Sequence, residues 1–231
     1  MNFSLEIGPK TDIDTIPALK DVYITFLPGG DHKETAEKAG ELVRKGCNPI
    51  PHIPARSIEN NNHLKEYIDM CKDLGVKQCL VIGGSREPVG KFESSIQLLE
   101  TGYFEGLKIG IAGHPEGSPD ISDSELEKAM QDKKPYADYI VTQWLLDPQP
   151  IIDFISKQSV PVHVGITGPL KITSLIKFAN IVGAKNSINF LKSNFSKALD
   201  LMKPKDPNDI IGKLKDHTDH FHIYTFGGLK E

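Results

Sequence analysis

The stretch from Ser57 to Ile82, SIENNNHLKEYIDMCKDLGVKQCLVI, contains the unit from which the fold is inferred. Its first part spaces apolar residues three or four positions apart, as on one face of a helix. These residues are Leu64, Tyr67, Ile68, Cys71 and Leu74. Ser57 is the predicted N-cap, and Gly75 is the predicted stop. Because Cys79–Ile82 is continuously apolar, we expect a helix over Ser57–Leu74 followed by a strand buried on both faces.

The same unit recurs along the chain. Short apolar runs of the β type are predicted at Phe3–Ile7, Val22–Phe26, Ile50–Ile53, Cys79–Ile82, Ile109–Ala112, Tyr139–Thr142, Val162–Ile166 and His222–Thr225. Further helices are predicted at Thr35–Gly46, Ile172–Ile181, Asn186–Met202 and Pro207–Leu214. Strands alternating with helices indicate a parallel sheet with helices on the outside. Eight units favour one closed (β/α)8 TIM barrel, forming a single domain over residues 1–231.

The alternative is an open doubly wound sheet. That architecture more often has a Gly-rich dinucleotide-binding turn directly after its first strand. The sequence there is Gly8-Pro9-Lys10, which is no such turn. The comparison therefore favours the barrel.

Composition excludes several classes of function. The 231 residues carry a formal net charge of −4, with 39% hydrophobic and 25% charged residues, as in an ordinary globular protein. No stretch concentrates Lys and Arg, so we expect no nucleic-acid partner. The N-terminus has no basic start followed by a long apolar run, and no segment reaches membrane-spanning length. We therefore expect a cytoplasmic protein with no membrane partner.

The cysteines and histidines give no metal-binding pattern. Cys71 and Cys79 lie inside apolar runs, where a thiol behaves as a small hydrophobic group, so the three cysteines are interpreted as reduced. The cysteines lack the close spacing of metal ligands, although three histidines gather near the C-terminus. They are His217, His220 and His222. We predict no metal site.

Polar residues occur where predicted strands end, which in a TIM barrel is the face that carries the active site. They are Glu6, Thr25, His52, Gly83-Gly84-Ser85, His114 and Gln143. Glu6 lies between Leu5 and Ile7 on a buried strand, so desolvation would suit it to donate a proton near neutral pH. The alternative is a carboxylate paired with Lys or Arg at the barrel mouth. The histidines have a structural alternative, as does Gln143, whose amide can cap a loop.

Taken in order, these strand ends resemble the methylenetetrahydrofolate reductase family over almost the whole chain. The matching motifs are Phe3-Ser4-Leu5-Glu6-Ile7, Val22-Tyr23-Ile24-Thr25-Phe26, Pro51-His52-Ile53, Ala112-Gly113-His114-Pro115-Glu116 and Tyr139-Ile140-Val141-Thr142-Gln143. The resemblance implies a flavin-mediated hydride transfer between NAD(P)H and 5,10-methylenetetrahydrofolate, giving 5-methyltetrahydrofolate, or the reverse. It also implies that the protein is a homo-oligomer, as family members commonly are.

The resemblance also implies roles for individual residues. Glu6 becomes the general acid that protonates the folate, and Gln143 binds the pterin together with Thr142 and Ile172. The remaining residues are assigned to binding FAD. They are Thr25, His52, Gly83, Gly84, Ser85, His114 and Ser118.

Two departures leave alternatives open. Gly83-Gly84-Ser85 stands where the family has an arginine-glycine-aspartate turn beside the flavin, and Glu127–Lys133 does not align with the family's phosphate-binding helix. Folate binding is therefore better supported than flavin binding. The alternatives are a flavin-independent one-carbon enzyme with the same pterin pocket, and a tetrahydrofolate-binding protein without catalysis.

Overall fold

The computed structural model describes residues 1–118, 121–168 and 206–226. In this part of the chain eight parallel strands form a closed barrel, in which each strand pairs with the next and the last pairs with the first. They are β1 (Asn2–Ile7), β2 (Asp21–Ile24), β3 (Asn48–Pro54), β4 (Gln78–Ile82), β5 (Lys108–Gly113), β6 (Tyr139–Thr142), β7 (Val162–Thr167) and β8 (His220–Tyr224). The closed order confirms the (β/α)8 TIM barrel and excludes the open sheet.

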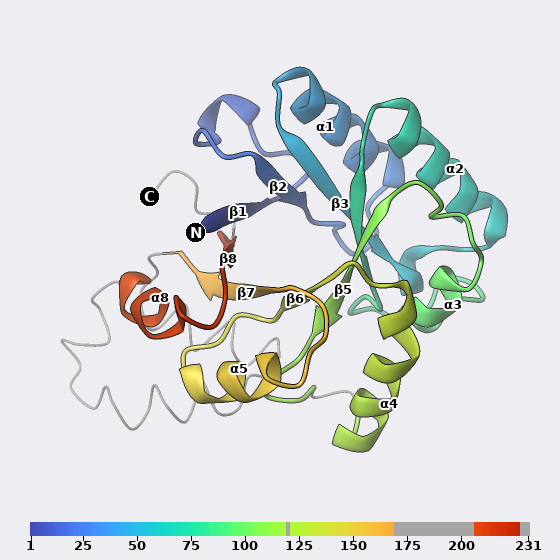
Figure 1. Ribbon diagram of the computed structural model, residues 1–231. Coiled ribbons are helices and arrows are strands. Elements are labelled where there is room, and N and C mark those ends of the chain that lie inside the picture. The colour runs from blue at the N-terminus through green and yellow to red at the C-terminus, as the bar shows by residue number, and fades with distance from the viewer. Residues whose placement is uncertain (119–120, 169–205, 227–231) are drawn as a thin grey trace, which may run out of the picture.

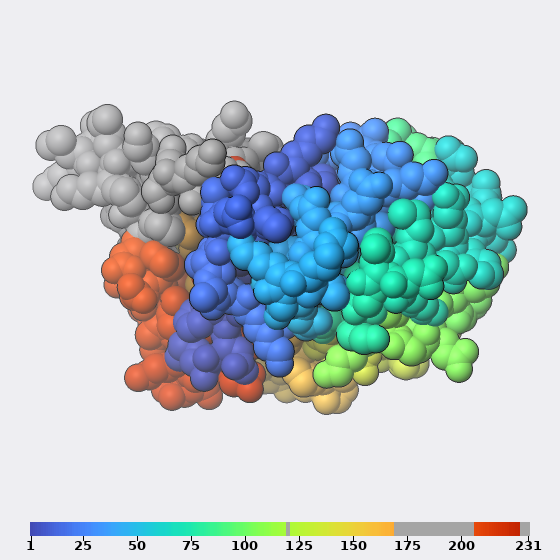
Figure 2. Space-filling model, turned by 90° about the horizontal axis from the view of Figure 1, so that it is seen from above, coloured from blue at the N-terminus to red at the C-terminus, as the bar shows by residue number. Residues whose placement is uncertain are grey.

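Helices surround the barrel on the outside (Figure 1). They are α1 (His32–Arg44), α2 (Asn61–Asp73), α3 (Ser95–Leu99), α4 (Asp123–Lys133), α5 (Pro148–Ile155) and α8 (Asn208–Leu214), with 3-10 turns η1 (Ile13–Thr15), η2 (Ala55–Ser57) and η3 (Lys134–Tyr136). Figure 2 shows α1 and α2, in light blue and teal, covering one side of the molecule. The helices predicted at Ile172–Ile181 and Asn186–Met202 lie outside the described residues.

The unit quoted first folds as a helix followed by a strand, with shifted boundaries, of which the start of the helix moves furthest. Helix α2 begins at Asn61 because the side chain of Asn60 accepts hydrogen bonds from the backbone N–H groups of Asn62 and His63. Ser57, the predicted N-cap, belongs to η2 instead. Gly75 follows the helix with a φ of 90°, a left-handed conformation that glycine adopts without strain, so the predicted stop is confirmed.

The strands separate two layers of side chains. The outward residues of the strands pack against the helices in an apolar layer, here called the outer layer, which includes Leu5, Val22, Ile53, Val81, Ile111, Ile140, Val164 and Phe221. The inward residues form a small apolar cluster of Tyr23, Ile50, Leu80, Tyr139 and Val141. Inward positions on β1, β7 and β8 are polar instead. Sequence periodicity did not predict this polar interior.

The cysteines have the predicted character. All three thiols are free, and Cys71 and Cys79 are buried. Burial raises the pKa of Cys71 to about 12, so its thiol stays protonated and packs as a hydrophobic group. Among the helices that the structure describes, none combines the length and the apolar character needed to cross a membrane.

Candidate functional site

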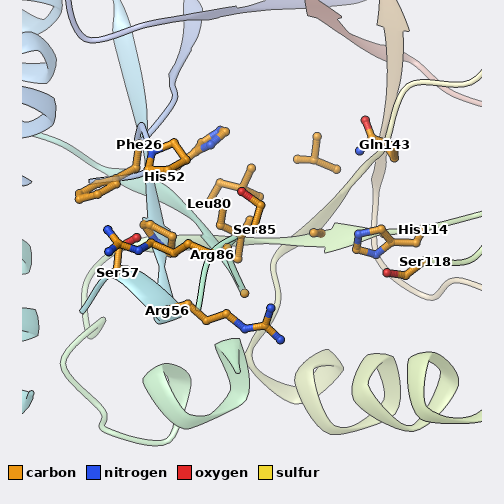
Figure 3. Close-up of a pocket in the computed structure, with 18 of the residues that line it drawn as sticks. Phe26, His52, Arg56, Ser57, Leu80, Ser85, Arg86, His114, Ser118 and Gln143 are labelled. Carbon is orange, nitrogen blue, oxygen red and sulfur yellow. The ribbon is translucent and has the colours of Figure 1, made fainter. Parts of the chain in front are cut away.

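A cavity of about 450 Å³ opens at the C-terminal ends of the strands. Most residues predicted for the site from the sequence line it. They are Glu6, His52, Gly83, Gly84, Ser85, His114, Ser118 and Gln143. Figure 3 shows His52 on one side of the cavity, with Gln143, His114 and Ser118 on the other. Glu6 and Gln143, which are far apart in the sequence, therefore face one shared space.

Glu6 lies between two imidazole rings. Its Oε2 is 3.5 Å from Nε2 of His52 and 3.6 Å from Nε2 of His222. Both Nε2 atoms are buried, and neither has a hydrogen-bond partner within the described part of the chain. Burial lowers the pKa of His52 to about 4. The charge of Glu6 opposes this shift, and His222 adds a smaller lowering. His52 is therefore neutral near pH 7, and the contact is not an ion pair.

The alternative of a carboxylate neutralised by Lys or Arg is not what the described residues show. The groups within ion-pairing distance of Glu6 in this part of the chain are the two histidines. The side chain of Glu6 is 15% exposed, so its carboxylate reaches the cavity. Glu6 is thus placed to exchange a proton with a bound molecule.

His222 was considered from the sequence as part of a histidine group but was not predicted for this site. Its Nδ1 lies 3.1 Å from Oγ of Ser4, and its ring packs on Tyr23 with 4.2 Å between centroids. These contacts fix the ring beside Glu6. The signal in the sequence is the spacing of His220, His222 and Tyr224, because alternate residues of a strand face the same side. Within the described residues no group of three or more His, Cys, Asp or Glu side chains is arranged to hold a metal ion.

Two arginines on the loops after β3 and β4 also line the cavity, and the sequence analysis missed both. Arg56 donates from Nε to the backbone oxygen of Glu93 at 3.0 Å, which leaves the other guanidinium nitrogens for a ligand. The backbone N–H of Arg56 donates to the carbonyl of Gly83, which ties the two loops together. Figure 3 shows Arg56 and Arg86 on the His52 side of the cavity, opposite Gln143.

Glycines allow these loops to approach each other. Gly84 has a φ of 91°, and a Cβ there would lie 3.3 Å from Cβ of Pro54. A Cβ on Gly90 would lie 1.9 Å from the backbone oxygen of Glu59, so no other residue fits without moving the backbone. The turn at Gly83-Gly84-Ser85 therefore brings Arg86 to the cavity.

The remaining predicted residues lie elsewhere or play other parts. Thr25 donates from its hydroxyl to the backbone oxygen of Ile7, and it is not among the residues lining the cavity. Thr142 is fully buried, and its hydroxyl accepts from the N–H of Gly165. The amide oxygen of Gln143 accepts from the N–H of Trp144, so Gln143 caps its own loop while lining the cavity. Ile172 lies outside the described residues.

The fold and the site define the chain as a TIM-barrel protein with a cavity at the C-terminal ends of its strands, lined by both apolar and polar side chains. Solved structures with the same fold include oxaloacetate acetylhydrolase in complex with the inhibitor 3,3-difluorooxalacetate, at a TM-score of 0.60 and 10% identity over 98% of this chain and 75% of that one. The structure of 2,3-dimethylmalate lyase, a PEP mutase/isocitrate lyase superfamily member, has a TM-score of 0.60 and 7% identity over 99% and 77%.

A mutant tryptophan synthase alpha-subunit from the hyperthermophile Pyrococcus furiosus matches with a TM-score of 0.57 and 11% identity, over 99% of this chain and 92% of that one. No family model matches the chain. Identities this low establish the fold and leave the function to be argued from the site.

The resemblance to the methylenetetrahydrofolate reductase family is wrong. The matching structures are barrels of the PEP mutase/isocitrate lyase and tryptophan synthase alpha types, and no family model supports the resemblance. The folate oxidoreductase function, tetrahydrofolate, FAD and the folate-binding alternatives are withdrawn with it. The physical reason is that strand ends converge on the site in every TIM barrel, so short polar motifs at those positions recur without shared ancestry.

Proposed function

We propose that the chain is an enzyme in which Glu6 exchanges a proton with a small anionic substrate during a lyase-type reaction. The observation that carries this proposal is the position of Glu6. Its carboxylate faces the cavity and lies 3.5 and 3.6 Å from two imidazole nitrogens, which lack hydrogen-bond partners in residues 1–118, 121–168 and 206–226. A carboxylate placed in this way serves as a general acid or base.

The neutral state of His52 matters for this role. Since burial lowers the pKa of His52 to about 4, the ring does not add a positive charge beside Glu6 near neutral pH. When Nε2 of the neutral ring carries the hydrogen, it donates a hydrogen bond to the carboxylate of ionised Glu6. When Nε2 carries the lone pair, it accepts a hydrogen bond from the carboxylic acid of protonated Glu6. The site therefore accommodates both protonation states of Glu6, as a proton-transfer step requires.

The substrate class follows from Arg56 and Arg86. Both line the cavity, and a guanidinium group binds carboxylate or phosphate through paired N–H donors. The cavity of about 450 Å³ lies in the size range of small-molecule sites. An anionic group held by the arginines would place the rest of the molecule between Glu6 and Gln143.

The comparisons support a lyase-type reaction. The names of the matching proteins describe enzymes, among them 2,3-dimethylmalate lyase and oxaloacetate acetylhydrolase. Making or breaking a bond in such small acids leaves a proton to be donated or removed, which is the step assigned to Glu6.

The test uses oxaloacetate, 2,3-dimethylmalate and inorganic phosphate as probes. Binding is measured by calorimetry, and consumption of the two organic acids is followed by nuclear magnetic resonance. We expect Glu6→Gln to keep binding within about threefold and to lower turnover by about 10²- to 10⁴-fold. Glu37→Gln, on the exposed face of α1, is the matched control and should turn over like the natural protein.

The double variant Arg56→Gln/Arg86→Gln tests the anion. It should weaken binding of the probes by about tenfold or more, whereas Arg44→Gln on α1 should leave binding unchanged. Equal turnover by Glu6→Gln would remove Glu6 from the reaction. Failure of all three probes to bind, or equal binding by the double variant, would exclude the anionic substrate.

A further inference from the structure

The barrel interior below Glu6 contains a continuous row of polar groups that the proposed reaction does not use. Nε2 of His222 lies 3.6 Å from Glu6, and Nδ1 of the same ring lies 3.1 Å from Oγ of Ser4. The same Ser4 oxygen lies 3.0 Å from Nε2 of His220. The row below Glu6 consists of three residues, Ser4, His220 and His222, and is here called the histidine–serine row. Its members come from only two strands, β1 and β8, which pair side by side.

The row connects the two ends of the barrel. Ser4 and His222 are fully buried in its middle. At the lower end, the ring of His220 stacks on His163 with 3.6 Å between centroids. Both of these rings line a second cavity of about 330 Å³ at the N-terminal ends of the strands. The row therefore runs from the candidate site to an opening on the opposite face.

The hydrogen bonds restrict where the hydrogens lie. Ser4 has one hydroxyl hydrogen, so it donates to one imidazole and accepts from the other. When Nδ1 of His222 is the acceptor, the hydrogen of that ring is on Nε2 and faces Glu6. His220 then donates from Nε2 to Ser4, and its Nδ1 is free of hydrogen. Desolvation lowers the pKa of His220, which favours the neutral ring that this arrangement needs.

We propose that the histidine–serine row conducts protons between Glu6 and the second cavity. This inference rests on the proposed role of Glu6. After Glu6 has given its proton to a substrate, Nε2 of His222 donates a proton to the carboxylate, and Nδ1 of His222 takes one from the hydroxyl of Ser4. Ser4 takes one from Nε2 of His220, and Nδ1 of His220 takes one from water in the second cavity.

The transfer is balanced at every atom. Each member of the row loses one hydrogen and gains one, so no net charge stays in the core, and one proton passes from the lower cavity to Glu6. The rings end as the opposite tautomers. The row returns to its starting state when the steps run backwards, as they do when Glu6 acts as a base.

A purely structural role does not account for one feature. If the row were only structural, the hydrogen bonds of the two histidines to Ser4 would be sufficient, and Nε2 of His222 would not need to face Glu6. Instead, Nε2 of His222 is fully buried, faces the carboxylate and has no hydrogen-bond partner among the residues that the structure describes. Such an atom costs stability unless it is used, and catalytic hydrogen bonds are often long before a substrate binds.

The test follows the ring hydrogen of His222 by nuclear magnetic resonance in protein labelled with ¹⁵N-histidine, with no substrate present. Glu6→Gln closes the upper end, because an amide does not take up and release protons near neutral pH. In this background, exchange with water proceeds through Ser4 and His220. Adding Ser4→Ala should slow exchange of the His222 hydrogen by about tenfold or more, as expected when exchange must wait for local opening.

The matched control is Tyr23→Phe in the same Glu6→Gln background. It removes a buried hydroxyl from a ring that packs on His222, but this hydroxyl bonds His163 and lies outside the row. The exchange rate should stay within about twofold, since local opening is unchanged. His220→Phe interrupts the row at the second cavity and should slow exchange as Ser4→Ala does.

Unchanged exchange in either Ser4→Ala or His220→Phe would overturn the proposal, as would equal slowing by Tyr23→Phe. Because no substrate takes part, this result is independent of the turnover measurement on Glu6→Gln. The row can fail while Glu6 remains catalytic, and Glu6 can fail while the row still conducts.

Discussion

The two sides of the same β-strands differ in chemistry. The outer layer is a continuous apolar contact between strands and helices. The interior instead combines a small apolar cluster with Glu6, His52, Ser4 and His222. Apolar burial is the main favourable term in folding, whereas burying a polar group costs free energy unless the group is paired. The difference indicates that the outer layer stabilises the barrel and that the interior serves the site.

The largest expected effect on stability comes from the outer layer. Phe221 is fully buried there and stacks on Phe3 with 6.0 Å between ring centroids. Phe221→Ala should lower the free energy of unfolding by about 3–5 kcal/mol, because it removes apolar contacts and leaves a cavity. Urea denaturation followed by circular dichroism measures this loss. A loss below about 1 kcal/mol would contradict the assignment of stability to the outer layer.

The polar interior should make the free energy of unfolding depend on pH through His52. The folded pKa of His52, about 4, lies below the ordinary value of 6.5. Between these values the unfolded chain binds a proton that the folded protein does not, so acid favours unfolding. The contribution of His52 to the free energy of unfolding is complete above pH 6.5. It is lost as the pH falls from 6.5 to 4, and the loss is on the order of 3 kcal/mol.

The measurement compares the natural protein with His52→Gln by urea denaturation at several pH values. Other histidines contribute equally to both proteins and cancel in the difference. The free-energy difference between the two proteins should change across this pH window and stay constant above it. A difference that is flat across the whole window would show that His52 is not buried as a neutral ring.

The smallest expected effect tests how tightly β7 packs against β6 and against the ring of Tyr224. Gly165 on β7 leaves space for its neighbours, since a Cβ there would lie 2.4 Å from the backbone oxygen of Thr142 and 2.8 Å from the ring of Tyr224. Gly165→Ala should therefore cost about 1–3 kcal/mol through overpacking. Gly212→Ala, on α8, is the control, because no atom of the described residues lies within 4 Å of its Cβ position. A loss no greater than that of the control would show that β6 and β7 yield without strain.

The site could be predicted from the sequence only in part. Glu6, His52 and Gln143 were found because strand ends in a TIM barrel point at one face. Thr142 was assigned to the site together with Gln143 through the family resemblance. Neighbouring residues of a strand face opposite sides, however, and Thr142 faces away from the cavity. Arg56 and Arg86 were missed because they lie in loops after the strands, Arg56 in a 3-10 turn and Arg86 after a glycine turn. Hydrophobic periodicity does not predict the direction that such loops take.

By itself the sequence determined the barrel, because eight apolar strand patterns alternating with amphipathic helices can bury their surfaces in few ways. It did not determine the function, since the motifs at the strand ends gave a family resemblance that proved wrong. Only the tertiary structure decided that His222 joins Glu6 and that two loop arginines share their cavity. Those contacts depend on how distant segments meet when the barrel closes, and no local pattern records distances between them.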